Sequence, residues 1–518
     1  MDADPTKAGK QIYYNGRSYY DNGLRKPGQL AGTVPLFLAI LFAATLALRM
    51  CHVRILWTDE DYHLAAGIQT LYGKLLYRDL WYDKPPLAAW VYAALGAFPG
   101  WPLRLFDAFY VLAICAAMYR FARDLWGELE GFCAAGLIAF FLSFDHASAI
   151  IPIAPDLFML LPHILAVHAA WRGRAFQAGL WSGIAFLFHT KGLFVLAMCA
   201  ILAWRAIVPL LAGFAIPGGA LLAFLGWKGA LSGYLQQVWQ WGLAYSRSSP
   251  IGNPVANGLR RTADWLGFHV LLVLGAASLW WRRQNGWIAL WCVVSFCGVA
   301  SGTLFAPRYF LQLLPPLVLA ASRGLVLLLE VPAPPRRRMV WAVVIAALLL
   351  PIGRFGPRYF VLAEDLLAHR AHRWTDVTLD QDDQAAAFYL NQYKRDGDTL
   401  FVWGYRPGDF VYTRLSAPSI FWDSQPLTGV PADRHLFDAR PILPEWAARN
   451  RVALAATRPT FIVDGLSLLN PRLAPRNYPE LRDWLGRYRI IGRTDLSIIY
   501  RLEETSQAFG GDNGARLR

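Results

Sequence analysis

The sequence predicts a mainly α-helical integral membrane protein with about eleven transmembrane helices and a C-terminal α/β domain on the external side. The composition is the first indication, because the 518 residues are 56% hydrophobic and only 17% charged, whereas soluble domains are about 25% charged. The mean hydropathy is +0.31. The second indication is that the apolar residues form long runs separated by basic clusters, as in chains that cross a bilayer repeatedly.

The formal net charge of +14 does not indicate a nucleic-acid-binding protein. The arginines fall between apolar runs, not on one basic face with a DNA- or RNA-binding motif, so we interpret them as topology signals. Five of the six cysteines lie inside apolar runs without metal-site spacing, so neither a disulfide framework nor a zinc site is expected. We predict no cofactor, and a divalent metal stays an open alternative.

Residues 1–29 form a polar tail with five basic residues, which the positive-inside tendency places in the cytoplasm. The apolar run that follows has no small-residue cleavage site, so we predict a retained span at 31–50 and not a signal peptide. Residues 51–103 then form an external loop. Within this loop, 61–77 and 86–98 have the pattern of short helices at the membrane surface.

Ten further apolar runs follow, and basic clusters recur at every second turn of the chain. This alternation places the N-terminus inside and the C-terminus outside, with a transmembrane domain over residues 30–353. The predicted spans cover residues 105–119, 131–144, 157–170, 178–189, 193–204, 207–226, 265–281, 287–303, 309–329 and 339–353.

The composition becomes polar after Gly353 and predicts an external α/β domain over residues 354–502. Short β-branched and aromatic runs predict strands, and two segments predict helices. The strands are expected at 400–403, 461–463 and 498–500, and the helices at 380–394 and 478–487. Residues 503–518 are predicted to be a disordered tail.

Six charged residues fall at external span ends once the spans are assigned in this way. They are Asp59, Glu60, Lys84, Asp156, Lys191 and Arg308. Ionisable groups near hydrocarbon are costly and are usually kept for a site, a pathway or an ion pair. Simpler interpretations stay open: Asp156 could cap its helix, Lys191 and Arg308 could meet lipid headgroups, and the acidic loop could hold only local salt bridges.

Five motifs, in this order and spacing, resemble those of GT-C glycosyltransferases. They are the acidic pair at 59–60, DKPPL at 83–87, an aspartate at the start of the fourth span, TKG at 190–192 and RYFLQLLPP at 308–316. The resemblance is to the branch with protein O-mannosyltransferases, the lipid A aminoarabinose transferase and the rhizobial galacturonosyltransferases. DTLFVWGYRPGDFVY at 398–412 also resembles the external domain of bacterial members.

This resemblance implies transfer of a sugar from a polyprenyl-phosphate donor at the external face of the bacterial cytoplasmic membrane. The acceptor would be a lipopolysaccharide, another glycan, a lipid or a protein hydroxyl, and neither it nor the sugar is identified. Carried over by motif, the catalytic residues would be Asp59, Glu60 and Asp156, and the donor phosphate would meet Lys84, Lys191, Arg308 and Tyr309. Asp61 adds a third carboxylate, so the choice of base among Asp59, Glu60 and Asp61 stays open.

Elementary chemistry agrees with this assignment, because a glycosyl phosphate needs cations beside its departing phosphate and one carboxylate to take the acceptor proton. Two other functions are kept as alternatives. A transporter or flippase would bind the lipid-linked substrate without chemistry, although such sites tend to lie at repeat interfaces near the bilayer midplane. In a membrane-anchored scaffold, the external domain would act and the charged loop would be dispensable.

Overall fold

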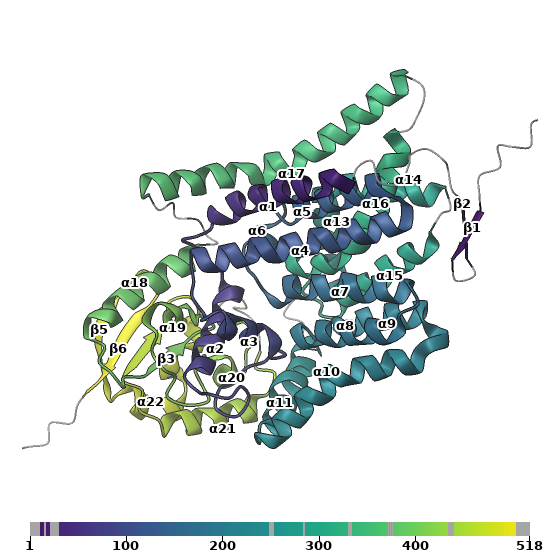
Figure 1. The fold of residues 1–518 in the computed structure, drawn as a ribbon. Coiled ribbons are helices and arrows are strands. Elements are labelled where there is room, and N and C mark those ends of the chain that lie inside the picture. The colour runs from purple at the N-terminus through teal and green to yellow at the C-terminus, as the bar shows by residue number, and fades with distance from the viewer. Residues whose placement is uncertain are drawn as a thin grey trace, which may run out of the picture.

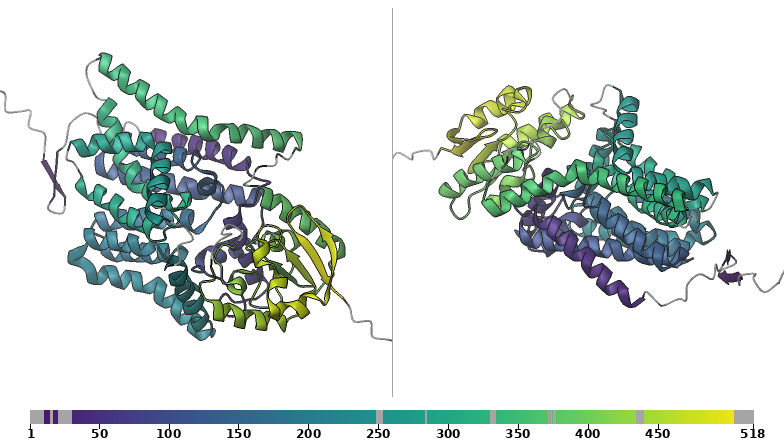
Figure 2. Two further views of the ribbon diagram at one scale, coloured as in Figure 1. Left: turned by 180° about the vertical axis from the view of Figure 1, so that it is seen from behind. Right: turned by 90° about the horizontal axis from the view of Figure 1, so that it is seen from above.

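The computed structural model describes a helical bundle with a smaller α/β layer packed against one end (Figure 1). The described residues are 11–14, 17–20, 31–247, 253–282, 285–329, 334–370, 372, 374, 377–433 and 440–503. Most of the predicted cytoplasmic tail and the predicted disordered tail beyond residue 503 therefore lie outside the described residues. A hairpin of β1 (Gln11–Tyr14) and β2 (Arg17–Tyr20) lies at the bundle end opposite the α/β layer (Figure 2).

Each predicted span overlaps at least one helix. The helices of the bundle are α1 (Val34–Met50), α4 (Trp101–Trp126), α5 (Glu128–Phe141), α6 (Ala147–Ile150), α7 (Pro155–Trp171), α8 (Ala175–Phe188), α9 (Gly192–Leu202), α10 (Ile207–Trp227), α11 (Leu231–Tyr234), α12 (Trp241–Arg247), α13 (Pro254–Phe268), α14 (Val270–Trp281), α15 (Gly286–Ala300), α16 (Leu314–Leu329) and α17 (Pro334–Ala368). A π-helix, η4 (Leu235–Gln240), precedes α12, and a 3-10 helix, η5 (Pro307–Leu313), leads into α16.

Four helical segments among the described residues are long and apolar enough to cross a membrane, or five if a bent pair counts as one span. The four cover Trp101–Trp126, Trp204–Trp227, Pro307–Leu329 and Arg337–Ala368, and shorter apolar helices accompany them. The chain is therefore a multi-pass membrane protein. The count of eleven spans stays a prediction, because several helices are shorter than the ~20 residues that a bilayer requires.

Two predicted segments differ from the structure. The span predicted at 265–281 is divided between α13 and α14, whose axes meet at 90°. The boundary predicted at Gly353 lies inside α17, which continues to Ala368. Polar composition alone does not end a helix, and this one contains Pro351 and Pro357 without stopping at either. The ribbon of α17 is visibly bent (Figure 1).

The C-terminal layer contains a four-stranded sheet in the order β3-β4-β6-β5. Its strands are β3 (Leu400–Trp403), β4 (Phe461–Asp464), β5 (Tyr488–Arg493) and β6 (Ile498–Leu502), and its helices are α18 (Thr378–Tyr393), α19 (Gly408–Thr413), α20 (Gln425–Thr428), α21 (Pro444–Ala455) and α22 (Pro479–Leu485). β3 and β4 are parallel, while β4 with β6 and β5 with β6 are antiparallel. All residues of β3 and β4 are buried, which explains their continuous apolar runs.

The C-terminal layer is docked on the loop that the sequence predicted as external. That loop forms α2 (Thr58–Leu71) and α3 (Leu87–Ala94). The Gln69 amide donates to the Leu415 carbonyl at 3.0 Å and accepts from the Ala417 amide at 2.9 Å. The Trp422 ring stacks on Tyr62 with centroids 5.2 Å apart. This docking holds α2 and the acidic residues at its start against a rigid support.

Candidate active site

Arg308 joins two of the predicted carboxylates. Its guanidinium forms an ion pair with Asp59, and its Nε lies 3.5 Å from Asp156 Oδ2. Asp59 is in the first turn of α2, Asp156 in the first turn of α7, and Arg308 in the first turn of η5. Three segments distant in sequence therefore place their polar ends together. The Asp59 side chain is 16% exposed and that of Asp156 only 4%.

The other predicted cations lie beside this cluster. Lys191 Nζ sits 3.2 Å from the centroid of the Tyr309 ring, and the Arg308 guanidinium lies 5.7 Å from the same centroid. Lys84 Nζ pairs with Asp83 Oδ2 at 2.8 Å. Within the described part of the chain, Lys191 Nζ is buried and makes no hydrogen bond. Its ammonium therefore rests on an aromatic face and not on a hydrogen-bond acceptor of the described residues.

Electrostatics connect these side chains. Burial lowers the pKa of the Lys191 ammonium from 10.5 to about 8, although Asp156 raises it and Lys84 lowers it. Burial also acts on Lys84, but the charge of Asp83 and its hydrogen bond outweigh it and raise the Lys84 pKa. The group therefore acts as one coupled electrostatic site.

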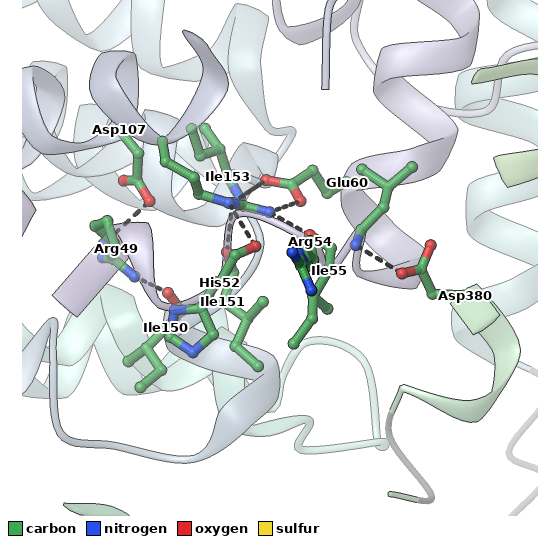
Figure 3. A network of polar contacts seen from close by, with 12 residues as sticks. Arg49, His52, Arg54, Ile55, Glu60, Asp107, Ile150, Ile151, Ile153 and Asp380 are labelled. Carbon is green, nitrogen blue, oxygen red and sulfur yellow. Dashed lines mark hydrogen bonds and ion pairs between the residues drawn. The ribbon is translucent and has the colours of Figure 1, made fainter. Parts of the chain in front are cut away.

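Glu60 is not part of this cluster. Its side chain is fully buried, and both carboxylate oxygens accept from Arg104 of α4, at 2.8 and 2.7 Å. Glu60 Oε1 also accepts from the Ile153 amide at 3.1 Å. The structure thus separates the acidic pair, because Asp59 pairs with Arg308. Glu60 instead lies in the buried polar network beside Ile153 (Figure 3). Asp61 accepts a hydrogen bond from the Tyr62 amide.

Arg104 uses all five of its N–H groups. Besides the two bonds to Glu60, it donates to three backbone carbonyls, those of His52 at 3.3 Å, Ile55 at 2.7 Å and Ile151 at 3.2 Å. The first two carbonyls lie shortly before Asp59, and the third lies five residues before Asp156. One buried side chain therefore ties together the two loops that carry the clustered carboxylates.

A second arginine supports the same loops. Arg49 of α1 pairs with Asp107 of α4, its Nε lying 3.0 Å from Oδ2, and donates to the carbonyls of Leu142 and Ile150 (Figure 3). The Leu56 amide donates to Asp380 Oδ2 of the C-terminal layer at 3.1 Å. The segment before Asp59 is therefore held from the bundle on one side and from the C-terminal layer on the other.

Three residues of this region were not among the predicted site residues. His189 Nε2 lies 3.8 Å from Asp156 Oδ1. Asp83 forms an ion pair with Lys84. Arg104 had no sequence signal, because it falls between the predicted external loop and the predicted span 105–119 and its partner is 44 residues away. Among the described residues, no group of three or more His, Cys, Asp or Glu side chains is arranged to hold a metal ion.

Known proteins resemble this chain in fold. ArnT from Cupriavidus metallidurans in its apo state matches 90% of this chain and 97% of its own, with a TM-score of 0.56 and 14% identity. The same protein bound to undecaprenyl phosphate matches with a TM-score of 0.57 and 15% identity, over 90% of this chain and 98% of its own. ArnT is a lipid A aminoarabinose transferase with the GT-C architecture. The chain has the GT-C fold.

An oligosaccharyltransferase, AglB from Archaeoglobus fulgidus in complex with an inhibitory peptide and a dolichol-phosphate, also matches. Its TM-score is 0.48 at 10% identity, over 92% of this chain and 75% of its own. No family model and no curated protein sequence matches the chain. The GT-C fold of this chain is shown by its structural similarity to ArnT, at 14% and 15% sequence identity. The motif order from residue 59 to residue 316 is consistent with the same fold.

Proposed function

We propose that this protein is a membrane glycosyltransferase that moves a sugar from a polyprenyl-phosphate donor to an envelope acceptor. The reaction would take place at the external face of the bacterial cytoplasmic membrane. The acceptor would be a hydroxyl of lipopolysaccharide, another glycan, a lipid or a protein. Neither the sugar nor the acceptor is distinguished by the residues of the candidate site.

The observation that carries this proposal is Arg308 held between Asp59 and Asp156, with Lys84 and Lys191 beside it. Arg308 and Lys84 have carboxylate partners, whereas Lys191 is buried without a hydrogen-bonding partner among the described residues. A buried cation of this kind fits an anionic ligand, because an unpaired charge away from water is costly. The bound undecaprenyl phosphate of ArnT, which shares the fold, supports a lipid phosphate as that ligand.

In the proposed reaction, the acceptor hydroxyl attacks the anomeric carbon of the donor sugar. The bond between this carbon and the phosphate oxygen breaks, and its electron pair leaves with polyprenyl phosphate. The phosphate gains negative charge during this step, so Arg308, Lys84 and Lys191 stabilise the transition state more than the ground state. Arg308 provides a planar fork for two phosphate oxygens, whereas the two lysines provide compact charges.

Asp59 is the base in this proposal, and it takes the proton of the acceptor hydroxyl. Glu60 is unsuitable, because both of its oxygens are occupied by Arg104 and its side chain is fully buried. The Asp156 side chain is more buried than that of Asp59 and lies close to both Arg308 and His189. We assign Asp156 the role of holding Arg308 in place, with Tyr309 providing the surface on which Lys191 rests.

The decisive experiment is incubation of the purified protein with polyprenyl-phosphate sugars and envelope acceptors, with release of polyprenyl phosphate as the readout. Release that depends on the acceptor supports a transferase. Movement of the intact lipid-linked sugar across a vesicle bilayer without release would identify a flippase instead. Binding without release or movement would favour the scaffold function.

Asp59→Asn should lower turnover by about 10²- to 10⁴-fold, the usual contribution of a general base. Binding of polyprenyl phosphate should persist, because Lys84, Lys191 and Arg308 remain. Asp79→Asn is the matched control, since Asp79 lies in the same loop but pairs with its neighbour Arg78 and accepts from the Leu75 amide. Equal turnover of the two variants would remove Asp59 from the role of base.

A further inference from the structure

A cavity of about 480 Å³ lies between α14, α16 and α17, away from the candidate active site. This volume is within the ~300–1,000 Å³ typical of ligand pockets. The lining is mainly apolar and comes from one face of each helix, with Leu274, Leu328 and Val343 as examples. Ser278 and Arg282 are its polar members. An apolar groove with one cation at its end has the shape of a site for an amphiphile.

The groove exists because α14 and α16 pack closely while α17 stands apart. A Cβ on Gly324 would collide with the Gly275 carbonyl of α14, so the two backbones are in direct contact. By contrast, the apolar window of α17 is only 28% buried, compared with 89% for the segment containing α16. α17 runs along the outside of the bundle (Figure 1). The space between it and the other two helices is therefore open to an apolar ligand.

Basic residues surround one end of this groove. Arg282 lies at the end of α14, and its guanidinium donates to the Leu327 carbonyl at 3.5 Å. Arg337 and Arg338 are exposed and directly precede Met339, which lines the cavity. The positive-inside tendency places this end of the bundle at the cytoplasmic leaflet. Basic pockets between membrane helices on that side suit anionic lipid headgroups.

We propose that this groove binds one anionic phospholipid of the cytoplasmic leaflet. An acyl chain would lie between α14, α16 and α17, and the headgroup phosphate would meet Arg282, Arg337 and Arg338. The lipid would fasten α17, which leads directly to the C-terminal layer that supports the acidic loop. The inference does not rest on the proposed function, because neither a sugar donor nor an acceptor takes part.

The test is native mass spectrometry of the full-length protein released from bilayers of equal phosphatidylglycerol and phosphatidylethanolamine. We expect one tightly retained phosphatidylglycerol on the wild-type protein. Val343→Trp fills the groove and should lose this lipid. Val293→Trp is the control, since Val293 is a comparably exposed valine of α15, at 58% against 48% for Val343. It should retain the lipid.

Charge selectivity is tested separately. Arg282→Gln should keep a bound lipid but lose the preference for phosphatidylglycerol, whereas Arg205→Gln, an exposed arginine outside the groove, should keep the preference. If Val343→Trp does not fold, addition of phosphatidylglycerol should raise the unfolding temperature of the wild-type protein and not of Arg282→Gln. Equal retention of both lipids by the wild-type protein would overturn the proposal. Displacement of phosphatidylglycerol by equimolar polyprenyl phosphate would also overturn it, because the groove would then belong to the donor chain.

Discussion

Arg104→Lys tests whether the buried arginine positions the candidate active site. The substitution keeps the positive charge but replaces five fixed N–H groups with three, so at least two of the five acceptors lose their partner. Each buried acceptor left without a hydrogen bond costs about 1–3 kcal/mol, and two such losses cost about 2–6 kcal/mol. The acceptors lie in the loops that carry Asp59 and Asp156. We therefore expect the lost hydrogen bonds to displace these two carboxylates.

We expect Arg104→Lys to lower both the unfolding temperature and the turnover per folded molecule. A misplacement of about 1 Å at reacting groups costs on the order of 10²-fold in rate. Turnover would be measured by polyprenyl phosphate release at saturating donor, and unfolding by a thermal melt of the purified protein. The fall in kcat, beyond the loss of folded protein, separates a positioning role from a merely structural one.

Arg120→Lys is the matched control, because Arg120 lies on the same helix but is exposed. Surface substitutions of this kind change the free energy of unfolding by no more than about 0.5 kcal/mol. The positioning argument is refuted if Arg104→Lys melts and turns over like the control. It is also refuted if kcat is unchanged once the amount of folded protein is corrected for.

Three further predictions concern the cations and the docking surface. Arg308→Lys keeps the charge but loses the two-pronged geometry, so turnover should fall clearly in the release assay while the melting temperature stays near that of the wild-type protein. Since the Lys191 pKa is lowered to about 8, donor-phosphate affinity, measured by titration calorimetry, should fall as pH rises through that value. The unfolding free energy should instead rise with pH between that value and 10.5, where the unfolded chain binds more protons, and Lys191→Gln should flatten both trends. Trp422→Ala removes a fully buried ring that stacks on Tyr62, and it should cost about 3–5 kcal/mol in chemical unfolding.

Much of the helical layout could be predicted from sequence, because apolar runs and basic clusters report local periodicity and topology. In this way the sequence predicts elements close to their observed positions, such as the strand at 400–403 and the helices that start near residues 157 and 193. β5 was missed, because its sequence YRIIGR lacks a clear alternation and contains a glycine at a register shift. The bend at His269 was also missed, since both α13 and α14 have acceptable helical patterns and only packing decides the angle between them.

The candidate site was predictable to a different degree. The assignment of spans predicted Asp59, Asp156 and Arg308 at one membrane face, and the structure places these three in contact. The motifs could not distinguish Asp59 from Glu60, because adjacent helical residues point in directions about 100° apart and only a distant partner shows which one is buried. That partner is Arg104, and no local sequence pattern identifies it.

The docking of the C-terminal layer on the acidic loop has a consequence for engineering. Gln69 bonds to the backbone at Leu415 and Ala417, and the Trp422 indole donates to the Trp81 carbonyl at 2.7 Å. These contacts make residues 56–84 and the C-terminal layer a single recombination unit. A chimera that exchanges the layer alone would leave Gln69 and the Trp81 carbonyl facing foreign surfaces. A functional exchange would have to transplant both segments together.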